Sequence, residues 1–494
     1  MVTQGKNRHC GQFLRPSLLA LLGCLLLFRP MSGSAQLQSL VASNTAFALN
    51  LYGQLATNQG NLFFSPYSIS TCLAMTYAGA RGETAAQMAQ VMGFGTNQPQ
   101  FASLFGQLLS EIEADQQTNA LELNTADALW IQEGYPFLPS FLETATNQYQ
   151  ANLNQVDFGT EAAAATQDIN NWVAQETQNK IQNILPAGSI NASTRLVLVN
   201  AIYFLGVWTE AFAVSNTLTQ PFYLSTNSQV QVPLMHQFVP TIMGGSGLAF
   251  PYMESSNFQA IELPYASNQV SMVILLPSQV DGWRQLEQQL SPAFLSAVLA
   301  QMSPRYIDIF LPRFTLESSF DLSETLENMG MPDAFAPGAA DFSGIDGAQD
   351  LVISDVLHKA WVAVNEAGTE AAATTVTIVT PTVGLMSPVF RADHPFLFFI
   401  RDTQSGSLLF LGRVANPSPS VANAAPALHL SLTPSGQSLN ISWPYPSTGW
   451  TLRQNPDLST TNWTPSGGIT NDGTNNFLSI STQAGALFFR LSQP

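Results

Sequence analysis

The stretch Val364–Pro395, VNEAGTEAAATTVTIVTPTVGLMSPVFRADHP, combines patterns that one helix or one strand does not normally contain. Gly368 precedes a run of small residues, 369–375, and the β-rich run 376–380 follows directly. Alanine-rich runs are typical of helices, whereas alternating Thr and Val are typical of half-buried strands. No charged residue occurs from Ala371 to Phe390. The pattern fits a segment that is exposed in one state and joins a β-sheet in another.

Alternation along this segment supports that interpretation. Side chains alternate between the two faces of a strand, so positions 369, 371, 373 and 375 would share one face. These positions hold Thr, Ala, Ala and Thr, and none of them would bury a charge or a bulky group. A plain helix followed by a plain strand remains the simpler alternative on these residues alone.

The residues around the glycine resemble the reactive-centre loop of the serpins, whose hinge typically reads Glu-x-Gly-Thr-Glu-Ala-Ala-Ala. Residues 366–373 read E-A-G-T-E-A-A-A. The resemblance implies the α+β serpin fold, with three β-sheets, about nine helices and an exposed loop. It also implies a hinge made of Glu366, Gly368, Thr369, Glu370, Ala371, Ala372, Ala373, Thr374 and Thr375.

Further serpin-like motifs occur in the expected order over residues 36–417. They are NLFFSPYSIS at 61–70, LVNAIYFLGVW at 198–208, FLPRF at 310–314 and the C-terminal signature at 393–417. Each motif alone is modest support. Their common order is difficult to explain without a shared fold.

The resemblance also assigns two polar sites to the main sheet. The cluster beneath the place where the sheet parts, called the shutter, corresponds to Ser65, Ser68, Asn200 and His358. The breach, where the loop begins to insert, corresponds to Trp208, Arg313 and Glu366. We hypothesise an ion pair between Glu366 and Arg313. A lone histidine is usually a structural group, and His358 fits that role.

Composition limits the partners. The 494-residue chain is 46% hydrophobic and carries a net charge of −17, which disfavours nucleic acid and anionic membranes. Its three lysines, at 6, 180 and 359, cannot form a heparin-like basic patch. We expect a monomer without cofactor or metal.

The first 35 residues are typical of a secretory signal peptide. A basic start precedes the apolar run Leu18–Phe28 and the small residues 32–35. A lipoprotein site at Cys24 is the alternative, although that cysteine lies inside the apolar run. Removing the segment would leave Cys72 as the single cysteine, interpreted as a buried hydrophobe. We expect a secreted protein, or a periplasmic or cell-surface one attached through its C-terminal region.

Hydrophobic periodicity predicts mixed helices and strands without regular alternation. Helices are expected at 40–55, from Ser65–Pro66 onward, at 101–115, 161–178 and 283–301. Strands are expected at 62–64, 126–131, 195–205, 260–264, 270–276, 306–314 and 358–364, with a terminal hairpin of 396–400 and 407–414.

Composition changes after the hairpin. The run ANPSPSVANAAPA at 415–427 is typical of a linker. Residues 428–494 contain four charged residues and short alternating apolar runs, which predict a small all-β module. The predicted organisation is a signal peptide at 1–35, a serpin domain at 36–417, a linker at 418–427 and the β module at 428–494.

The resemblance implies a suicide-substrate inhibitor of serine endopeptidases, which forms a covalent complex. Counting about seventeen residues from Glu366 gives Thr382-Val383 as the reactive bond. The bonds Leu385-Met386 and Met386-Ser387 remain alternatives. None offers Lys or Arg, so elastase-, chymotrypsin- or subtilisin-like proteases fit best, and a cysteine protease remains open.

Two other classes of function fit the sequence less well. Catalysis is disfavoured because the chain has five histidines and lacks HExxH, GxSxG, phosphate-loop and paired Cys/His motifs. A non-inhibitory binding or surface-attachment protein, with the β module as its adhesive part, is the second alternative.

Overall fold

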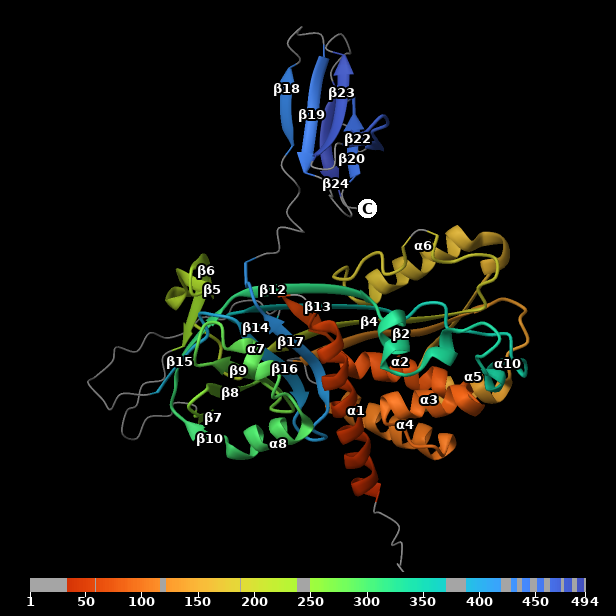
Figure 1. The fold of residues 1–494 in the computed structure, drawn as a ribbon, viewed down its shortest axis with the longest axis horizontal. Coiled ribbons are helices and arrows are strands. Elements are labelled where there is room, and N and C mark those ends of the chain that lie inside the picture. The colour runs from red at the N-terminus through yellow and green to blue at the C-terminus, as the bar shows by residue number, and fades with distance from the viewer. Residues whose placement is uncertain are drawn as a thin grey trace, which may run out of the picture.

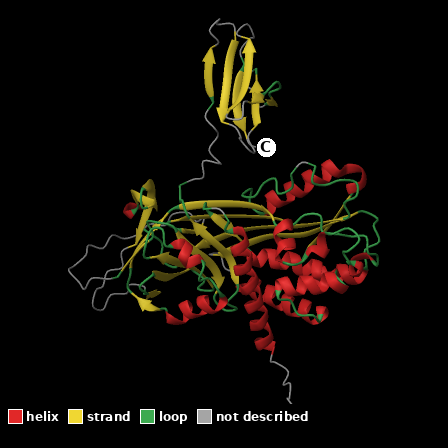
Figure 2. Cartoon of the chain, viewed as in Figure 1, coloured by secondary structure: helices red, strands yellow, loops and turns green. Residues whose placement is uncertain are grey.

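The fold was obtained as a computed structural model and comprises three β-sheets with helices packed around them, followed by a strand-rich C-terminal region (Figures 1 and 2). The structure describes residues 33–57, 59–115, 121–186, 188–237, 249–369, 388–418, 428–432, 438–444, 451–456, 463–471, 475–481 and 487–492.

A six-stranded sheet is the centre of the molecule. Its strand order is β12 (Phe314–Asp321), β13 (Leu357–Asn365), β14 (Gly368–Thr369), β4 (Leu196–Val207), β2 (Leu121–Gln132) and β3 (Asn152–Val156). The apolar run predicted at 195–205 is β4, which lies between β13 and β2. Strands with neighbours and helices on both faces need such continuous apolar sequence.

Two further sheets pack around the same core. The seven-stranded sheet has the order β1 (Leu62–Phe64), β17 (Leu408–Val414), β16 (Phe396–Asp402), β9 (Val270–Pro277), β8 (Phe258–Pro264), β7 (Phe250–Glu254) and β10 (Ser303–Arg305). The four-stranded sheet has the order β15 (Val389–Arg391), β11 (Asp308–Pro312), β6 (Ser228–Gln237) and β5 (Leu218–Ser225). The predicted terminal hairpin is the antiparallel pair β16 and β17.

Helices cover both faces of the six-stranded sheet (Figure 1). The α-helices are α1 (Gly33–Leu55), α2 (Pro66–Gly79), α3 (Gly82–Met92), α4 (Gln98–Asp115), α5 (Pro139–Gln148), α6 (Phe158–Glu176), α7 (Trp283–Glu287), α8 (Pro292–Gln301), α9 (Ser323–Met329) and α10 (Ser343–Asp346). Two 3₁₀ turns are η1 (Val214–Asn216) and η2 (Pro332–Phe335). Helix α6 lies on one face and α2 on the other, so the sheet separates a small apolar cluster under α6 from the main core.

Helix α2 begins where the sequence predicts. The Ser65 side chain accepts a hydrogen bond from the Ser68 amide, and Pro66 occupies the first turn, where no amide hydrogen is needed. Nearly every residue of this helix is buried, Cys72 included. The helix therefore places Ser65 and Ser68 inside the core beneath the six-stranded sheet.

Two predicted elements are each divided into two in the structure. The helix expected at 283–301 is two helices, α7 and α8, because Pro292 disfavours helical geometry before it and Ser291 caps the new helix. The strand expected at 306–314 divides at Arg313 into β11 and β12, which belong to different sheets. Pro312 cannot donate a ladder hydrogen bond, and the chain crosses between the sheets just beyond it.

The C-terminal region contains strands in two small sheets. One has the order β18 (His429–Leu432), β19 (Ser438–Pro444), β23 (Asn475–Ser481) and β22 (Thr470–Asn471), and the other β21 (Thr464–Pro465), β20 (Thr451–Asn455) and β24 (Phe488–Ser492). Ile441, Trp443 and Leu452 belong to its separate apolar cluster. This strand-rich content fits the expected small all-β module, while residues 419–427 of the predicted linker at 418–427 lie outside the described residues.

Asn61 anchors the chain where it leaves β17. Its side-chain oxygen accepts hydrogen bonds from the amides of Ala415 and Asn416, both at 2.8 Å, and its side-chain nitrogen donates to the Asn416 carbonyl at 2.7 Å. The chain after β17 is thus attached to the residue immediately before β1. None of the helices in the described part of the chain has the length and apolar content needed to cross a membrane.

A buried ionic cluster joins α1, α7 and β17. The fully buried Arg413 donates to Glu287 Oε1 at 2.6 Å and to the Gly60 carbonyl at 2.7 Å, and its guanidinium lies 4.5 Å from the Trp283 ring. The Tyr52 hydroxyl donates to the same carboxylate. Burial and Glu287 together raise the pKa of Tyr52.

Replacing Arg413 with Ala should therefore be strongly destabilising. The Glu287 side chain, 13% exposed, would lose its counter-ion, and such losses cost about 3–5 kcal/mol. Thermal unfolding at a fixed scan rate measures the change. Arg284→Ala is the control, because Arg284 is exposed and contacts the same Trp283 ring at 5.0 Å. Equal midpoints for the two variants would contradict the role assigned to the cluster.

Candidate functional site

The first two residues after the turn at 366–367 already lie inside the six-stranded sheet. Gly368 pairs with Val207 of β4 and Asn365 of β13, and Thr369 pairs with Gly206 and Val364. Both pairings are antiparallel. Strand β14 therefore lies between β4 and β13 at the C-terminal ends of these two strands, which we call the upper end of the sheet.

Gly368 is required by sterics at this point. Its φ is +153°, and a Cβ atom built there would lie 2.0 Å from the Gly206 carbonyl oxygen. No side chain fits at that distance. The glycine that the sequence singles out is thus a residue at which the backbone lies too close to β4 for any side chain.

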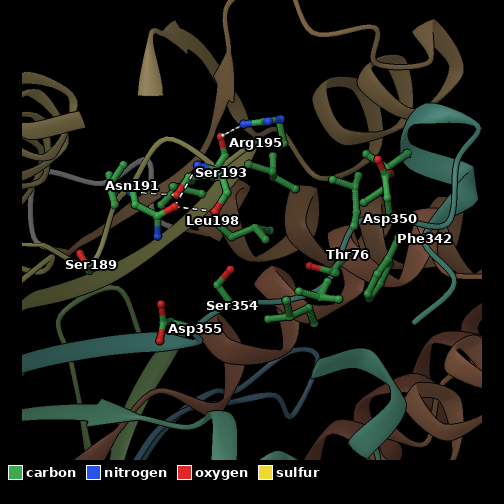
Figure 3. Close-up of a pocket in the computed structure, with 18 of the residues that line it drawn as sticks. Thr76, Ser189, Asn191, Ser193, Arg195, Leu198, Phe342, Asp350, Ser354 and Asp355 are labelled. Atoms are coloured by element: carbon green, nitrogen blue, oxygen red, sulfur yellow. Dashed lines mark hydrogen bonds between the residues drawn. The ribbon is translucent and has the colours of Figure 1, made fainter. Parts of the chain in front are cut away.

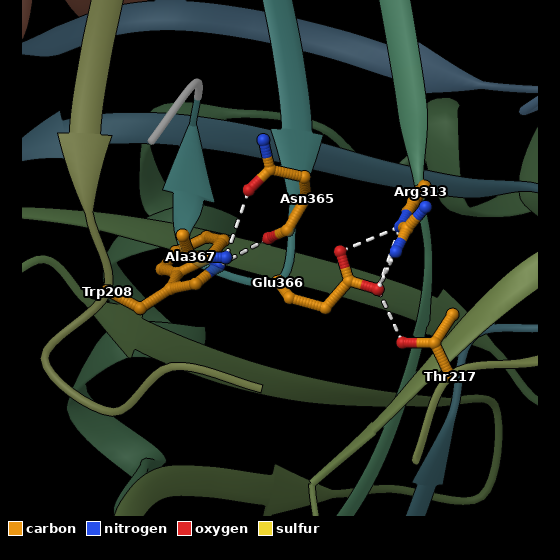
Figure 4. Close-up of polar contacts among 6 residues, drawn as sticks. All are labelled: Trp208, Thr217, Arg313, Asn365, Glu366 and Ala367. Atoms are coloured by element: carbon orange, nitrogen blue, oxygen red, sulfur yellow. Dashed lines mark hydrogen bonds and ion pairs between the residues drawn. The ribbon is translucent and has the colours of Figure 1, made fainter. Parts of the chain in front are cut away.

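Backbone and indole hydrogen bonds hold the turn before Gly368 (Figure 4). The Trp208 amide donates to the Ala367 carbonyl at 2.9 Å, and the Trp208 indole donates to the Asn365 carbonyl at 3.0 Å. The Phe212 amide donates to the Glu366 carbonyl at 2.8 Å. Trp208, predicted for the breach, therefore lies directly against the turn.

The hypothesised ion pair between Glu366 and Arg313 is present (Figure 4). The Arg313 Nε lies 2.7 Å from both carboxylate oxygens of Glu366. The Arg313 Nη2 and the Thr217 hydroxyl both donate to Oε1 of the same carboxylate. The Glu366 side chain is 6% exposed, whereas that of Arg313 is 41% exposed. Burial alone would raise the pKa of Glu366, but the hydrogen bonds from Arg313 and Thr217 outweigh it and lower the pKa.

Thr369 points into the core from β14. Its hydroxyl lies 2.7 Å from the Tyr265 hydroxyl, and both residues are completely buried. The Tyr265 ring stacks on Trp208 at 4.5 Å, and burial raises the pKa of this tyrosine. Thr369 thus faces the main core, as expected for the first inward position of the hinge.

Below β14, strands β13 and β4 pair directly with each other. We call this the seam: four parallel residue pairs that run from His358 opposite Asn200 to Trp361 opposite Tyr203. Parallel strands cannot be joined by a short hairpin, and β13 and β4 are accordingly far apart in the chain. Any strand that extends β14 downward must separate the two sides of this seam.

The four predicted shutter residues lie together under the seam. The Ser65 amide donates to His358 Nε2 at 3.0 Å, which leaves the ring proton on Nδ1, where it can donate to Asn200 Oδ1 at 3.0 Å. Asn200 in turn donates to the Ser68 carbonyl at 2.8 Å, and Ser65 Oγ donates to the Leu409 carbonyl at 2.6 Å. The network connects α2, β4, β13 and β17.

The arrangement keeps His358 neutral. The side chain is fully buried, and burial lowers its pKa to about 3. Protonation would place a hydrogen on Nε2 directly against the Ser65 amide hydrogen. Both ring nitrogens are engaged in structural contacts, so the network is suited to holding the sheet closed and not to proton transfer with a substrate.

A cavity of about 420 Å³ lies at the lower end of the sheet (Figure 3). It is lined by Leu196–Leu198 of β4, by Leu357 at the start of β13, and by residues 350–355, 189–191 and 193–195. The cavity therefore begins where β4 and β13 diverge below the seam. Among the described residues, no group of three or more His, Cys, Asp or Glu side chains is placed to share a metal ion.

Several predicted site residues lie outside the described residues. They are the rest of the hinge, Glu370, Ala371, Ala372, Ala373, Thr374 and Thr375, and the candidate bond residues Thr382, Val383, Leu385, Met386 and Ser387. The chain is described again from Pro388, whose carbonyl accepts from the Asp308 amide at 3.0 Å.

Sequence reasoning missed Thr217 and Tyr265. Thr217 contacts Glu366 across 149 positions of the chain, and Tyr265 contacts Thr369 across 104. Neither lies in a recognisable motif. The signal that could have suggested Tyr265 is its place at the end of the predicted strand 260–264.

Replacing Glu366 with Ala should loosen the turn at the top of the sheet. The lost hydrogen bonds to a charged group are each worth roughly 1–3 kcal/mol, and the exposure of Arg313 lowers that figure. We expect a lower thermal midpoint and faster polymerisation on mild heating, followed by native gel electrophoresis. Thr217→Ala, which removes a single contact, should give a smaller change in the same direction. An unchanged polymerisation rate for Glu366→Ala would count against the ion pair.

Acidification should weaken the seam through His358. Its folded-state pKa is about 3 and the ordinary value is 6.5, so the unfolded chain binds the proton more readily. Stability is retained above pH 6.5 and falls as the pH drops toward 3, by up to about 1.4 kcal/mol per pH unit. Thermal midpoints at several pH values test this. The His358→Gln variant should be less stable near neutral pH, and its stability should change less between pH 3 and 6.5. An equally steep pH dependence would refute the assignment.

Comparisons with known proteins agree with this geometry. Residues 42–417 match the family described as Serpin (serine protease inhibitor). The chain is 40% identical to the leukocyte elastase inhibitor of Xenopus tropicalis over 387 residues, covering 77% of this chain and 100% of the relative. It is 37% identical to an uncharacterised serpin-like protein of Thermococcus kodakarensis, covering 77% and 87%. The structure of uncleaved ovalbumin superposes with a TM-score of 0.67 at 32% identity, covering 76% of this chain and all of ovalbumin. The chain therefore belongs to the serpin family, whose members act on serine proteases as inhibitors and not as enzymes.

Proposed function

We propose that this protein is a secreted suicide-substrate inhibitor of elastase-, chymotrypsin- or subtilisin-like serine endopeptidases. The protease attacks the loop after Thr369 and forms an acyl-enzyme. The cleaved loop then inserts between β4 and β13, which carries the attached protease to the far end of the sheet and deforms its catalytic site. The native fold is a kinetically trapped state that this insertion releases.

The observation that carries this proposal is the position of β14. Two residues already pair with β4 and β13 in an antiparallel register. Continuing the same register would put Ala371 opposite Phe204, Ala373 opposite Ile202 and Thr375 opposite Asn200. Insertion would then lengthen an existing strand, which needs no new nucleus.

The inward positions suit that path. Thr369 faces the main core, so residues 371, 373 and 375 would face it as well. Ala at 371 and 373 passes the core without steric conflict, and Thr375 would reach the level of Asn200 and His358. A charged residue at any of these positions would be buried without a partner, at a cost of several kcal/mol.

The same register suggests where insertion ends. Val379 would lie opposite Leu196, the first residue of β4, beside the cavity lined by Leu196–Leu198. Pro381, which has no amide hydrogen, follows just beyond the strand. Cleavage at Thr382-Val383 would free the whole inserting segment. Cleavage at Leu385-Met386 or Met386-Ser387 would leave a few more residues attached after the inserted strand.

The proposed class of target protease depends on the residues at the candidate reactive bonds. The candidate bonds contain no Lys or Arg, and the relative from Xenopus tropicalis is named a leukocyte elastase inhibitor. Apolar or small bait residues favour proteases with apolar specificity pockets. The signal-like segment of residues 1–35 supports secretion, so the targets would be extracellular.

Incubation with elastase and with subtilisin tests the proposal. We expect an adduct that survives SDS and heat, and mass spectrometry of the released C-terminal fragment should identify the bond. Protein nicked in the loop should melt far above the intact protein. A Thr375→Arg variant is the control, because it should be cleaved without forming the adduct. Clean cleavage of the wild type without an adduct or a rise in melting temperature would favour a non-inhibitory binding protein.

A further inference from the structure

Both basic residues of the C-terminal region lie on one side of the small sheet formed by β21, β20 and β24. Arg453 of β20 and Arg490 of β24 occupy directly opposed positions in an antiparallel pair. The neighbouring residues Leu452 and Leu491 are also opposed, and both are buried in the apolar cluster of the region. Because side chains alternate between the two faces of a strand, both arginines point away from that cluster.

Trp463 lies across the same side of the sheet. The centre of its ring is 4.3 Å from the Arg490 guanidinium carbon, and its carbonyl accepts a hydrogen bond of 3.4 Å from Arg453 Nη1. Trp463 directly precedes β21, and β20 separates β21 from β24. The indole must therefore extend over β20 to reach Arg490.

Phe488 adds a second ring to this side. It lies two residues before Arg490 on β24, so the two side chains share a face. Phe488 is 36% exposed, and Arg490 is exposed as well. We call Arg453, Trp463, Phe488 and Arg490 the arginine face.

The opposed arginines repel each other. Like charges directly opposite on neighbouring strands are destabilising. Among the described residues, no carboxylate forms an ion pair with either arginine, and Arg453 Nε is buried without a hydrogen-bond partner. Asp457 and Asp472, the two acidic residues of the region, lie outside the described residues. A bound anion would relieve the repulsion between the two guanidinium groups.

The chemistry of the arginine face fits a sugar that carries an oxyanion. A guanidinium presents paired donors that match a carboxylate or a similar oxyanion, and an aromatic ring stacked on it fixes its plane and leaves its edge free. The C–H faces of sugar rings pack against aromatic side chains, and Trp463 and Phe488 place such rings beside Arg490. Charged and apolar contacts thus lie next to each other, as they do along an acidic polysaccharide.

Nucleic acid fits this face less well. Its closely spaced phosphates call for several cations, whereas the C-terminal region contains two. The net charge of the chain, −17, would repel a dense polyanion at long range. A polysaccharide with neutral sugar surface between its charges meets less repulsion and uses the aromatic rings.

We propose that the arginine face binds an acidic polysaccharide, with a carboxylate or sulfate held by Arg490 and Arg453 and the adjoining sugar rings packed on Trp463 and Phe488. The proposal does not rest on the proposed function, since none of these residues belongs to the loop, the turn at 366–367 or the seam. Such a site would hold the protein on a surface that carries the polymer.

Calorimetric titration of the full chain tests the proposal. Galacturonate oligosaccharides probe the carboxylate, and κ-carrageenan oligosaccharides probe the sulfate. The neutral counterparts are methyl-esterified galacturonate and agarose oligosaccharides, which should not bind. Single-stranded DNA should bind more weakly than the acidic sugars. The proposal would be overturned if neither acidic sugar bound, if the neutral sugars bound equally well, or if DNA bound more tightly.

Substitutions locate the site. Arg490→Ala should weaken binding about tenfold or more, as expected for losing hydrogen bonds to a charged group. Arg490→Lys, which keeps the charge without the paired donors, should also bind more weakly than the wild type. Arg284→Ala is the matched control, because Arg284 is exposed, lies 5.0 Å from the Trp283 ring and carries the same charge. An equal loss in Arg284→Ala would show that net charge alone drives binding and would refute the site.

Hydrogen exchange verifies the place and the integrity of the site. With the acidic sugar bound, peptides covering 451–456, 463–466 and 487–492 should exchange more slowly, while a peptide from β9 should not change. Without sugar, Arg490→Ala should exchange like the wild type in the same peptides. If that variant is loosened, Arg490→Lys decides in its place, and undiminished binding by a well-folded lysine variant would contradict the proposal. Protection confined to other parts of the chain would contradict it as well.

Discussion

The seam between β4 and β13 is the interaction on which the rest of the structure depends. Four parallel residue pairs hold the centre of the main sheet, while β14 occupies the upper end of the gap and a cavity occupies the lower end. Parallel pairing is slightly weaker per residue than antiparallel pairing, and an inserted strand would make antiparallel bonds on both of its edges. The closed sheet is thus less fully bonded than the sheet that the same chain could build.

Polar groups lie on both strands of this seam and join them to helix α2. In the buried network of His358, Asn200 and Ser65, each hydrogen bond joins a particular donor to a particular acceptor, so small displacements would cost whole hydrogen bonds. The Glu366 carboxylate works in the same way at the turn, where its partners come from two other elements. Because each polar contact is either made or broken, separating the two strands would cost several hydrogen bonds at once. The apolar core beneath the sheet could stay packed while they separate.

Local sequence signals predicted a large part of the fold, because those elements are determined by residues within a few positions. The helix after Ser65-Pro66, the strand at 62–64 and the terminal hairpin are of this kind. The division at Arg313 and the long hairpin of β5 and β6 were not predicted, because half-exposed strands with mixed polar residues carry weak periodicity. In the site, the family motif located Glu366 and Arg313, whereas Thr217 and Tyr265 are brought in by tertiary structure. Their roles depend on the path of distant strands, which no local pattern encodes.

The anchor at Asn61 has a mechanical consequence. The chain leaves the body beside β1 and β17, which pair in the seven-stranded sheet, and not beside β4 or β13. Tension applied through residues after 418 would pass into an antiparallel pair in which β17 is hydrogen-bonded on both edges. Under the proposed function, a protein tethered through these residues would not transmit that load to β4 and β13, the two strands between which the loop would insert.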